Sequence, residues 1–236
     1  MFIINKKRLI FIELSLIFSI LFASLYIENN TILTASTPVT GHSIILDAGH
    51  GLPDGGAENN NGLTEEKINL DIVLKLQKLL EASNCTVILT RSDENGIYSA
   101  DAKTLREKKV SDMKNRVNIA KELEADIFVS IHLNKIAQSK YFGWQTFYKK
   151  SSEDGKMLSL SIQNNLNSSI QIENKRQPQT ISGKYIIDNI KIPTVIVECG
   201  FLSNPTEANL LEKDSYQEKI AWGIYTGIMD FFSNNF

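Results

Sequence analysis

The sequence contains few of the residues that mark several common classes of protein. Its two cysteines, Cys85 and Cys199, are too few for a disulfide framework, and both lie in apolar runs where a cysteine usually packs as a small buried hydrophobe. Positive charge is not in excess, because 25 lysines and arginines stand against 27 acidic residues and leave a net charge of -2. No nucleic-acid partner is therefore expected. Histidine is also scarce, with three residues in 236 positions.

What the chain does contain is the composition of a globular domain. Hydrophobic residues make up 42% of the chain and charged residues 22%, which is typical of a folded protein rather than of a disordered or fibrous one. About 195 residues remain once an unusual N-terminal segment is set aside, and this length is enough for one domain with a sizeable core.

The N-terminal segment has the pattern of a membrane-targeting sequence. A basic cluster at residues 6–8 precedes a mostly apolar run at residues 9–27, whose length is close to the ~20 residues that span a bilayer. We predict that residues 1–36 form a signal peptide or transmembrane anchor with a linker, and that the globular domain at residues 37–236 is exported. The alternative is that the apolar run is a buried helix of the main fold.

Strand-like and helix-like patterns alternate along the rest of the chain. Strands are expected at residues 43–47, 86–90, 126–133, 143–148 and 193–199. Helices are expected at residues 64–81, 105–123, 154–167 and 216–232. This alternation predicts the α/β fold class, as a single domain with a mostly parallel, twisted sheet flanked by helices.

Two of the three histidines and one glutamate end strand-like segments. His50 follows the strand in "IILDAGHG", His132 ends the run "IFVSIH", and Glu198 ends "TVIVE". The carboxyl ends of parallel strands meet at one edge of a sheet, where functional groups collect. If these strands are parallel neighbours, residues that are 66 or more positions apart share one rim. The third histidine, His42, has no such neighbours and is expected on the surface.

Glu65 is a carboxylate at an unexpected position in the helix predicted at residues 64–81. At 100° per residue it projects into the middle of the apolar stripe, whereas Glu66 and Lys67 project away from it. The stripe consists of Ile68, Ile72, Val73, Leu76, Leu79 and Leu80. Burying a lone carboxylate is costly unless it is paired or bound to a metal. Alternatively, Glu65 only favours the dipole at the first turn of the helix, as acidic residues often do.

Together, His50, Glu65 and His132 have the composition of a catalytic zinc site, in which two histidines and one glutamate leave a fourth position open. The chain has neither an HExxH sequence nor a glutamate three residues after His50, so two common zinc-peptidase patterns are excluded. Glu198 is expected to be partly buried at the end of its strand. A carboxylate beside a zinc site can act as a general base and return the proton to a leaving amine; the alternative is a structural salt bridge.

Several motifs that occur in a fixed order resemble a known family. They are "IILDAGHG", "GGAE", "GLTEE", "LTR", "NRVNIAKELEADIFVSIHLN" and "IPTVIVECGFLSNPTEANLL". Over residues 43–232 the chain is similar to the zinc-dependent N-acetylmuramoyl-L-alanine amidases of the type 3 catalytic family. This resemblance implies that His50, Glu65 and His132 bind Zn2+, that Glu198 is catalytic, and that residues 37–236 form the amidase catalytic domain.

The resemblance also implies a substrate and a setting. Amidases of this family hydrolyse the amide between the lactyl group of N-acetylmuramic acid and L-alanine in peptidoglycan. The glycine-rich loop after His50 and "ECGFLSNPTE" look most similar to the spore cortex-specific branch, which removes the stem peptide before a deacetylase acts, in muramic-δ-lactam formation. The implied location is the cell wall or the forespore intermembrane space, with the protein anchored in the membrane or secreted. Alternatives are another zinc amidohydrolase or peptidase acting on cell-wall peptides, and a non-catalytic wall-binding protein.

Two departures from the family pattern and one short connection bear on regulation. Leu52 stands where the family usually has a glycine in the metal loop, and "NKRQPQT" at residues 174–180 lacks a basic pair that is common there. Only 65 residues separate His132 from Glu198, which leaves no spare helix to cover the site. We therefore expect restraint and targeting from outside, through export, membrane attachment and an accessory activating protein that completes or stabilises the zinc site.

Overall fold

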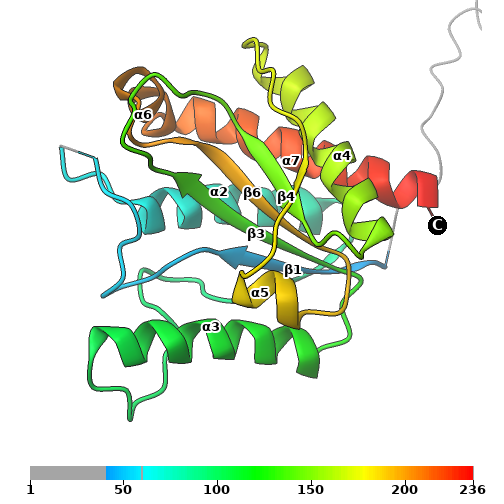
Figure 1. Ribbon diagram of the computed structural model, residues 1–236. Helices are drawn as coiled ribbons and strands as arrows, with labels where there is room; N and C mark the ends of the chain where they lie inside the picture. Colours follow the sequence, from blue (N-terminus) through cyan, green and yellow to red (C-terminus); the bar gives the residue numbers. More distant parts are fainter. Residues whose placement is uncertain (1–40, 60, 236) are drawn as a thin grey trace, which may run out of the picture. The chain divides into compact units, whose positions relative to one another are not determined.

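The computed structural model describes residues 41–59 and 61–235, which form a single α/β domain around a six-stranded sheet (Figure 1). The signal or anchor segment predicted at residues 1–36 lies outside the described residues. Within the described ranges, no helix is both long enough and apolar enough to cross a membrane.

The sheet is mixed rather than parallel throughout. Its strands are β1 (Ser43–Ala48), β2 (Thr86–Leu89), β3 (Ile127–Asn134), β4 (Gln145–Tyr148), β5 (Gln179–Thr180) and β6 (Thr194–Phe201). Their order is β2-β1-β3-β6-β4-β5. β2, β1, β3 and β6 are parallel to one another, as predicted. β4 is antiparallel to β6, and β5 is parallel to β4, which corrects the prediction of a mostly parallel sheet at this edge.

The direction of β4 follows from the connection that precedes it. β3 and β4 are joined by residues 135–144, which contain no helix, whereas a parallel return needs a crossover of a dozen or more residues. β4 therefore runs back in the opposite direction, and β6 later fills the space between β3 and β4. His50 follows β1, and His132 and Glu198 lie on β3 and β6; these three strands all belong to the parallel part of the sheet.

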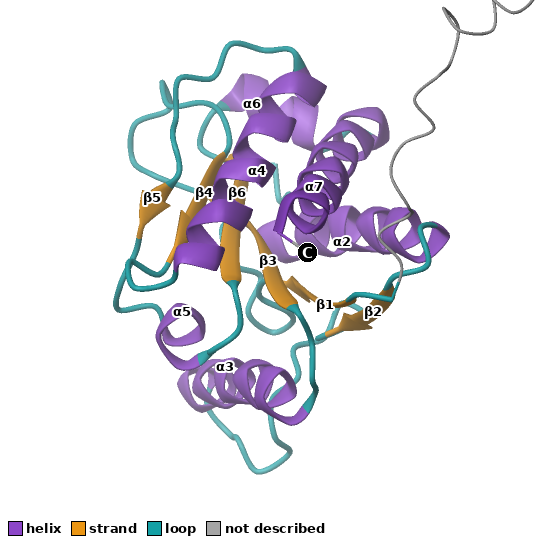
Figure 2. Ribbon diagram, turned by 90° about the vertical axis from the view of Figure 1, so that its right-hand side faces the viewer, coloured by secondary structure: helices purple, strands orange, loops and turns teal. Residues whose placement is uncertain are grey.

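Helices cover both faces of the sheet. They are α2 (Glu65–Ala82), α3 (Leu105–Glu122), α4 (Glu153–Ile170), α5 (Tyr185–Asn189), α6 (Pro205–Leu211) and α7 (Asp214–Asn235). α2, α4 and α7 pack on one face over the larger hydrophobic core, and α3 and α5 pack on the other face over a smaller core (Figure 2). The four long helices lie where the periodicity predicts them, whereas α5, α6 and β5 are too short to show a period.

The starts of α3 and α2 differ in how far a local sequence signal sets them. Thr104 begins α3 with a full capping box, in which its hydroxyl accepts from the Glu107 backbone N–H and the Glu107 carboxylate accepts from the Thr104 backbone N–H. Thr64 occupies the N-cap position of α2, but its hydroxyl donates to the Glu66 carboxylate and does not cap the helix. α2 is therefore stabilised mainly by its buried apolar face.

Expectations about individual residues away from the site are met in part. Cys85 and Cys199 are both buried, as predicted. His42 is not a plain surface residue, because its ring stacks on Phe232 at 3.9 Å between centroids. Its Nδ1 also lies 3.2 Å from the Asp126 carboxylate. The packing of α7 beside the start of β1 creates this contact, which no local pattern around His42 indicates.

Candidate metal centre

Three side chains from three separate elements meet at the carboxyl edge of the sheet. His50 follows β1, Glu65 opens α2, and His132 lies on β3, the strand next to β1. Glu65 Oε1 lies 3.0 Å from His132 Nδ1 and 3.3 Å from His50 Nε2. The three ligand atoms all lie within 4.8 Å of one another. The structure thus brings together the three residues that the sequence singles out as a possible ligand set.

Backbone hydrogen bonds explain how the Glu65 carboxylate is accommodated at the edge of the core. The residue is only 3% exposed. Its Oε1 accepts from the Leu133 backbone N–H at 3.0 Å, and its Oε2 accepts from the Ala57 backbone N–H at 2.9 Å. Charge-assisted bonds of this kind offset part of the desolvation cost of a buried carboxylate. They also fix the carboxylate between the two imidazole rings.

The neighbouring glutamate is buried as well, which corrects the expectation from the helical face. Glu66 is 5% exposed, although its position on α2 predicts a side chain that points away from the apolar stripe. The first turn of α2 is covered by Arg91, which donates to the Glu66 carbonyl at 2.7 Å. The Glu66 carboxylate accepts from the Thr64 hydroxyl and forms no hydrogen bond or ion pair with His50 or His132.

Two glycines allow the rings and the backbone of the cluster to approach closely. A Cβ on Gly49 would lie 2.3 Å from the His132 ring. A Cβ on Gly56, whose φ is +69°, would lie 2.7 Å from Glu65 Oε2 and 2.8 Å from His50 Cδ2. His50 itself has a φ of +64°, which is uncommon for a residue other than glycine. The contacts around His50 must therefore maintain its backbone conformation.

The charges of the cluster favour binding of a cation. Burial opposes the charged form of His50, but hydrogen bonds to Asp54 and Glu65 outweigh it and raise the pKa of His50 to about 9. Burial also opposes ionisation of Glu65, yet the hydrogen bonds from His132 and His50 hold the pKa of this carboxyl far below its usual range. An ionised carboxylate between two imidazoles stabilises positive charge, whether protons or a metal ion supply it.

Glu198 lies on β6, beside this cluster. It is the register partner of His132 in the parallel β3–β6 pairing, and of Gln145 in the antiparallel pairing with β4. The residue as a whole is partly exposed, as predicted, but its Oε2 is buried and has no hydrogen-bond partner among the described residues. Burial raises the pKa of the Glu198 carboxyl. Glu198 is thus placed to take up and release a proton next to the three clustered residues.

A buried arginine holds the backbone that leads into His50. Arg91 is 3% exposed and donates to the carbonyl oxygens of Ala48 at 2.8 Å and Gly49 at 3.1 Å. It also donates to Glu66, so that one guanidinium joins the end of β1 to the start of α2. Arg91 could not be assigned to the site from the sequence, because the carbonyl groups of Ala48, Gly49 and Glu66 lie 25 or more residues away from it along the chain.

A second buried arginine acts from the other face of the sheet. Arg116 of α3 is 2% exposed, and its guanidinium pairs with the buried carboxylate of Asp47. It also donates to the carbonyl oxygens of Ala48 and His50, while Asp112 accepts from its Nε. Asp47, a charged residue within the apolar run "IILDA", is a signal in the sequence that points to a buried ionic partner.

Another buried carboxylate follows Glu198 along the chain. Glu207 of α6 is fully buried, and accepts from the backbone N–H groups of Phe201 at 2.8 Å and Gly143 at 2.9 Å. It therefore ties the end of β6 to the segment that precedes β4. Burial outweighs these hydrogen bonds and raises the pKa of Glu207 to about 7.

The free energy of unfolding should consequently depend on pH through Glu207. Between pH 4.5 and about 7 the folded state retains a proton that the unfolded chain releases. The stability that this proton contributes is present below pH 4.5 and is lost as the pH rises through 7. In Glu207→Gln this dependence should be absent, so the difference in unfolding free energy between variant and wild type should change by roughly 2 to 3 kcal/mol between pH 4.5 and 8.

Denaturant titrations in the presence of a chelator measure this difference without interference from a bound metal. Glu212→Gln is the matched control, because Glu212 lies just after α6 and is exposed. The control should retain the pH dependence of the wild type. The same pH dependence in wild type and Glu207→Gln would contradict the assignment.

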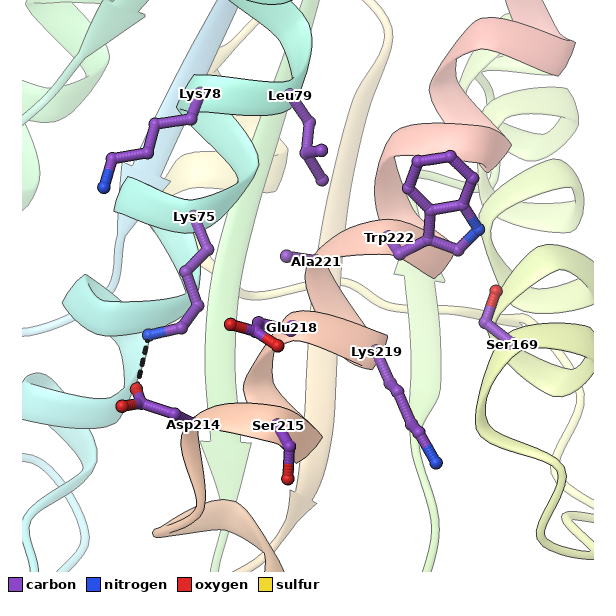
Figure 3. Close-up of a pocket in the computed structure, with 10 residues that line it drawn as sticks. All are labelled: Lys75, Lys78, Leu79, Ser169, Asp214, Ser215, Glu218, Lys219, Ala221 and Trp222. Atoms are coloured by element: carbon purple, nitrogen blue, oxygen red, sulfur yellow. Dashed lines mark hydrogen bonds and ion pairs between the residues drawn. The ribbon is translucent and has the colours of Figure 1, made fainter.

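A surface cavity of about 830 Å³ lies elsewhere, between α2 and α7 near the end of α4 (Figure 3). Its lining includes Lys75, which pairs with Asp214 at 2.8 Å, and the exposed side chain of Trp222. None of His50, Glu65, His132 and Glu198 lines it. The chemistry of the side chains therefore places the candidate active site at the cluster rather than in this cavity.

Comparison with known proteins defines the class to which this fold and cluster belong. The family model described as N-acetylmuramoyl-L-alanine amidase (Amidase_3) matches residues 44–230. The chain therefore belongs to the N-acetylmuramoyl-L-alanine amidase family, whose reaction is hydrolysis of the amide between N-acetylmuramic acid and L-alanine in peptidoglycan.

Three individual amidases are similar to this chain. A germination-specific N-acetylmuramoyl-L-alanine amidase of Bacillus subtilis (strain 168) is 34% identical over 227 residues, which cover 96% of this chain and 95% of that protein. The amidase LytC of the same organism is 33% identical over 83% of this chain, but the match covers 36% of LytC. The structure of the CwlD amidase from Clostridioides difficile, solved in complex with the GerS lipoprotein, is similar with a TM-score of 0.81 and 46% identity. That match covers 83% of this chain and 100% of the CwlD chain in that structure.

Proposed function

We propose that this protein is a zinc-dependent amidase in which His50, Glu65 and His132 hold Zn2+ and Glu198 transfers the proton. The observation on which this rests is the convergence of the three ligand atoms within 4.8 Å of one another, beside a buried carboxylate on the neighbouring strand. Membership of the amidase family supports the reaction.

The donor set suits zinc. Catalytic zinc is commonly bound by two histidine nitrogens and a carboxylate oxygen, with a further position left open. Here His50 Nε2 and His132 Nδ1 both face Glu65 Oε1, and the cluster includes no thiol. When bound, zinc would polarise the carbonyl of the scissile amide and lower the pKa of a water molecule at the site.

The residues of the chain account for the remaining steps. Glu198, with its buried and unpartnered Oε2, accepts a proton from the attacking water and delivers it to the departing amine nitrogen of L-alanine. The carbon–nitrogen bond breaks, which leaves a carboxylate on the lactyl group and a free amino group on the peptide. Glu65, fixed by the backbone N–H groups of Ala57 and Leu133, keeps the ligand geometry constant during the reaction.

Similarity to particular relatives supports a setting for the enzyme. The germination-specific amidase of Bacillus subtilis supports a role in spore cortex maturation, where removal of stem peptides precedes muramic-δ-lactam formation. Relatives described as cell wall amidases support a location in the cell wall or the forespore intermembrane space, reached by export through the segment at residues 1–36. This segment acts as a cleaved signal or as a membrane anchor. The complex of CwlD with the GerS lipoprotein supports an accessory protein as partner.

Analysis of the products of peptidoglycan digestion tests the proposal. With zinc-loaded protein, mass spectrometry should detect glycan strands with free lactyl carboxylates and peptides that begin with a free L-alanine amino group. After chelation of zinc, both products should disappear. Peptides cut at an internal bond would instead identify a peptidase. Binding to peptidoglycan with no cleavage at full zinc occupancy would identify a wall-binding protein.

A further inference from the structure

The two nitrogens of the His50 ring have separate partners. Nε2 faces Glu65 Oε1 at 3.3 Å, toward the candidate metal position. Nδ1 lies 3.1 Å from Oδ2 of Asp54, in the loop between β1 and α2. Asp54 is not one of the three clustered residues, so its contact with the ring is an additional feature of the site.

Asp54 is itself held by two further contacts. Its Oδ1 accepts from the Gly56 backbone N–H at 3.2 Å and pairs with the ammonium group of Lys109 at 2.8 Å. The backbone of Asp54 also exchanges two hydrogen bonds with Gly51, each 3.0 Å long. The carboxylate is therefore fixed in position before any metal binds.

Lys109 belongs to α3, which lies on the opposite face of the sheet from α2 (Figure 2). The helix is tied to the same loop seven residues further on, where the buried guanidinium of Arg116 donates to the His50 carbonyl. Its start is fixed by the capping box of Thr104 and Glu107. With the helix anchored on both sides of Lys109, the ammonium group is presented to Asp54 at a constant place.

These contacts determine which nitrogen of His50 is free. A metal ion takes the place of any proton on Nε2, and the Asp54 carboxylate, which accepts hydrogen bonds, then keeps the remaining ring proton on Nδ1. The lone pair of Nε2 is then directed at the candidate metal position. A carboxylate that orients a metal-binding imidazole in this way also makes the imidazole a stronger ligand.

We propose that Asp54 is a positioning residue for His50, and that Lys109 holds Asp54 in place, so that α3 adjusts the metal affinity of the site from the far face of the sheet. The inference rests on the proposed metal site. It adds a chain of contacts from Lys109 of α3 through Asp54 to His50. The His50 ring thereby contacts groups from both helical layers, since its other nitrogen faces Glu65 of α2.

Zinc dissociation constants of the full-length chain, measured by competition with a chromophoric chelator, test the proposal. Asp54→Asn should raise the Kd by about 10- to 100-fold, the usual effect of removing such a support. Lys109→Met keeps the apolar stem and removes the charge, and should raise the Kd by a smaller factor. Because Lys109 acts only through Asp54, its substitution should have no further effect in the Asp54→Asn background. The unfolding midpoint of the metal-free Lys109→Met variant should match that of the wild type.

The matched control is Asp71→Asn. Asp71 pairs with Lys67 on the surface of α2 at 2.9 Å, and neither residue contacts a histidine of the cluster, so the Kd should not change. A Kd of Asp54→Asn within twofold of the wild type would overturn the proposal. Equal effects of Lys109→Met in the two backgrounds would overturn it too. Failure of the wild type to bind zinc would instead refute the proposed metal site, so the two failures are distinguishable.

Discussion

Replacement of Glu198 by glutamine is expected to lower kcat by about 10²- to 10⁴-fold, the range over which general acid–base catalysis usually contributes. Glutamine has nearly the same shape, but it cannot take a proton from water or return one to the leaving amine. Glu198 is the register partner of His132 and presents a buried oxygen that has no partner among the described residues. Zinc content should remain that of the wild type, because Glu198 is not one of the three clustered residues.

The fold of Glu198→Gln should be at least as stable as that of the wild type. Burial raises the pKa of the Glu198 carboxyl, so any stability from its protonated form is already being lost as the pH rises toward neutrality. A neutral side chain at this position avoids that loss. Turnover, zinc content and the unfolding midpoint should be measured on the same preparation. Turnover close to that of the wild type would exclude Glu198 as the proton carrier.

Substitution of any one of the three proposed ligands should abolish both zinc retention and activity. His50→Ala and His132→Ala each leave two donors, too few for the three-ligand sites in which catalytic zinc is held. Glu65→Gln is preferable to alanine, because its amide oxygen can still accept from one of the two backbone N–H groups, those of Leu133 and Ala57, that bond to the carboxylate. An alanine there would leave both donors without a partner, and would confuse loss of metal with loss of stability.

The matched control for Glu65 is its neighbour. Glu66→Gln changes a carboxylate of the same helix that is almost equally buried, at 5% against 3% exposed. The Glu66 carboxylate bonds to the Thr64 hydroxyl and not to a histidine. Zinc content by mass spectrometry should therefore stay at the level of the wild type in Glu66→Gln and fall to background in Glu65→Gln. Equal losses in the two variants would indicate general damage to the first turn of α2.

The long elements of this fold could be predicted because each is long enough to show either a helical period or a continuous apolar run. The apolar spacing from Ile68 to Leu80 gives α2, and the continuous run "IFVSI" gives β3. The direction of β4 could not be predicted in the same way, because direction depends on the connection from β3 and on where β6 later pairs. α5 and α6, with five and seven residues, are shorter than two full helical turns and show no period.

Some residues of the candidate site could likewise be predicted from the sequence, and others could not. His50, Glu65 and His132 could be selected because each occupies an unusual place, at a strand end or on an apolar helical face. Asp54 and Arg116 show no such signal, since aspartate in a glycine-rich loop and arginine in a polar helix are both ordinary. Their significance comes from contacts across the fold, such as that between Arg116 and Asp47, 69 residues apart. Only the packing of α3 against β1 brings these groups together.

Anomalous diffraction at the zinc absorption edge, from crystals of the zinc-loaded protein, tests most directly whether His50, Glu65 and His132 bind the metal. The account predicts one strong peak about 2.0 to 2.2 Å from a nitrogen of each histidine and an oxygen of Glu65. The peak should be absent from crystals of His132→Ala prepared in the same way. A zinc peak at other residues of catalytically active protein, with none at these three, would contradict the account.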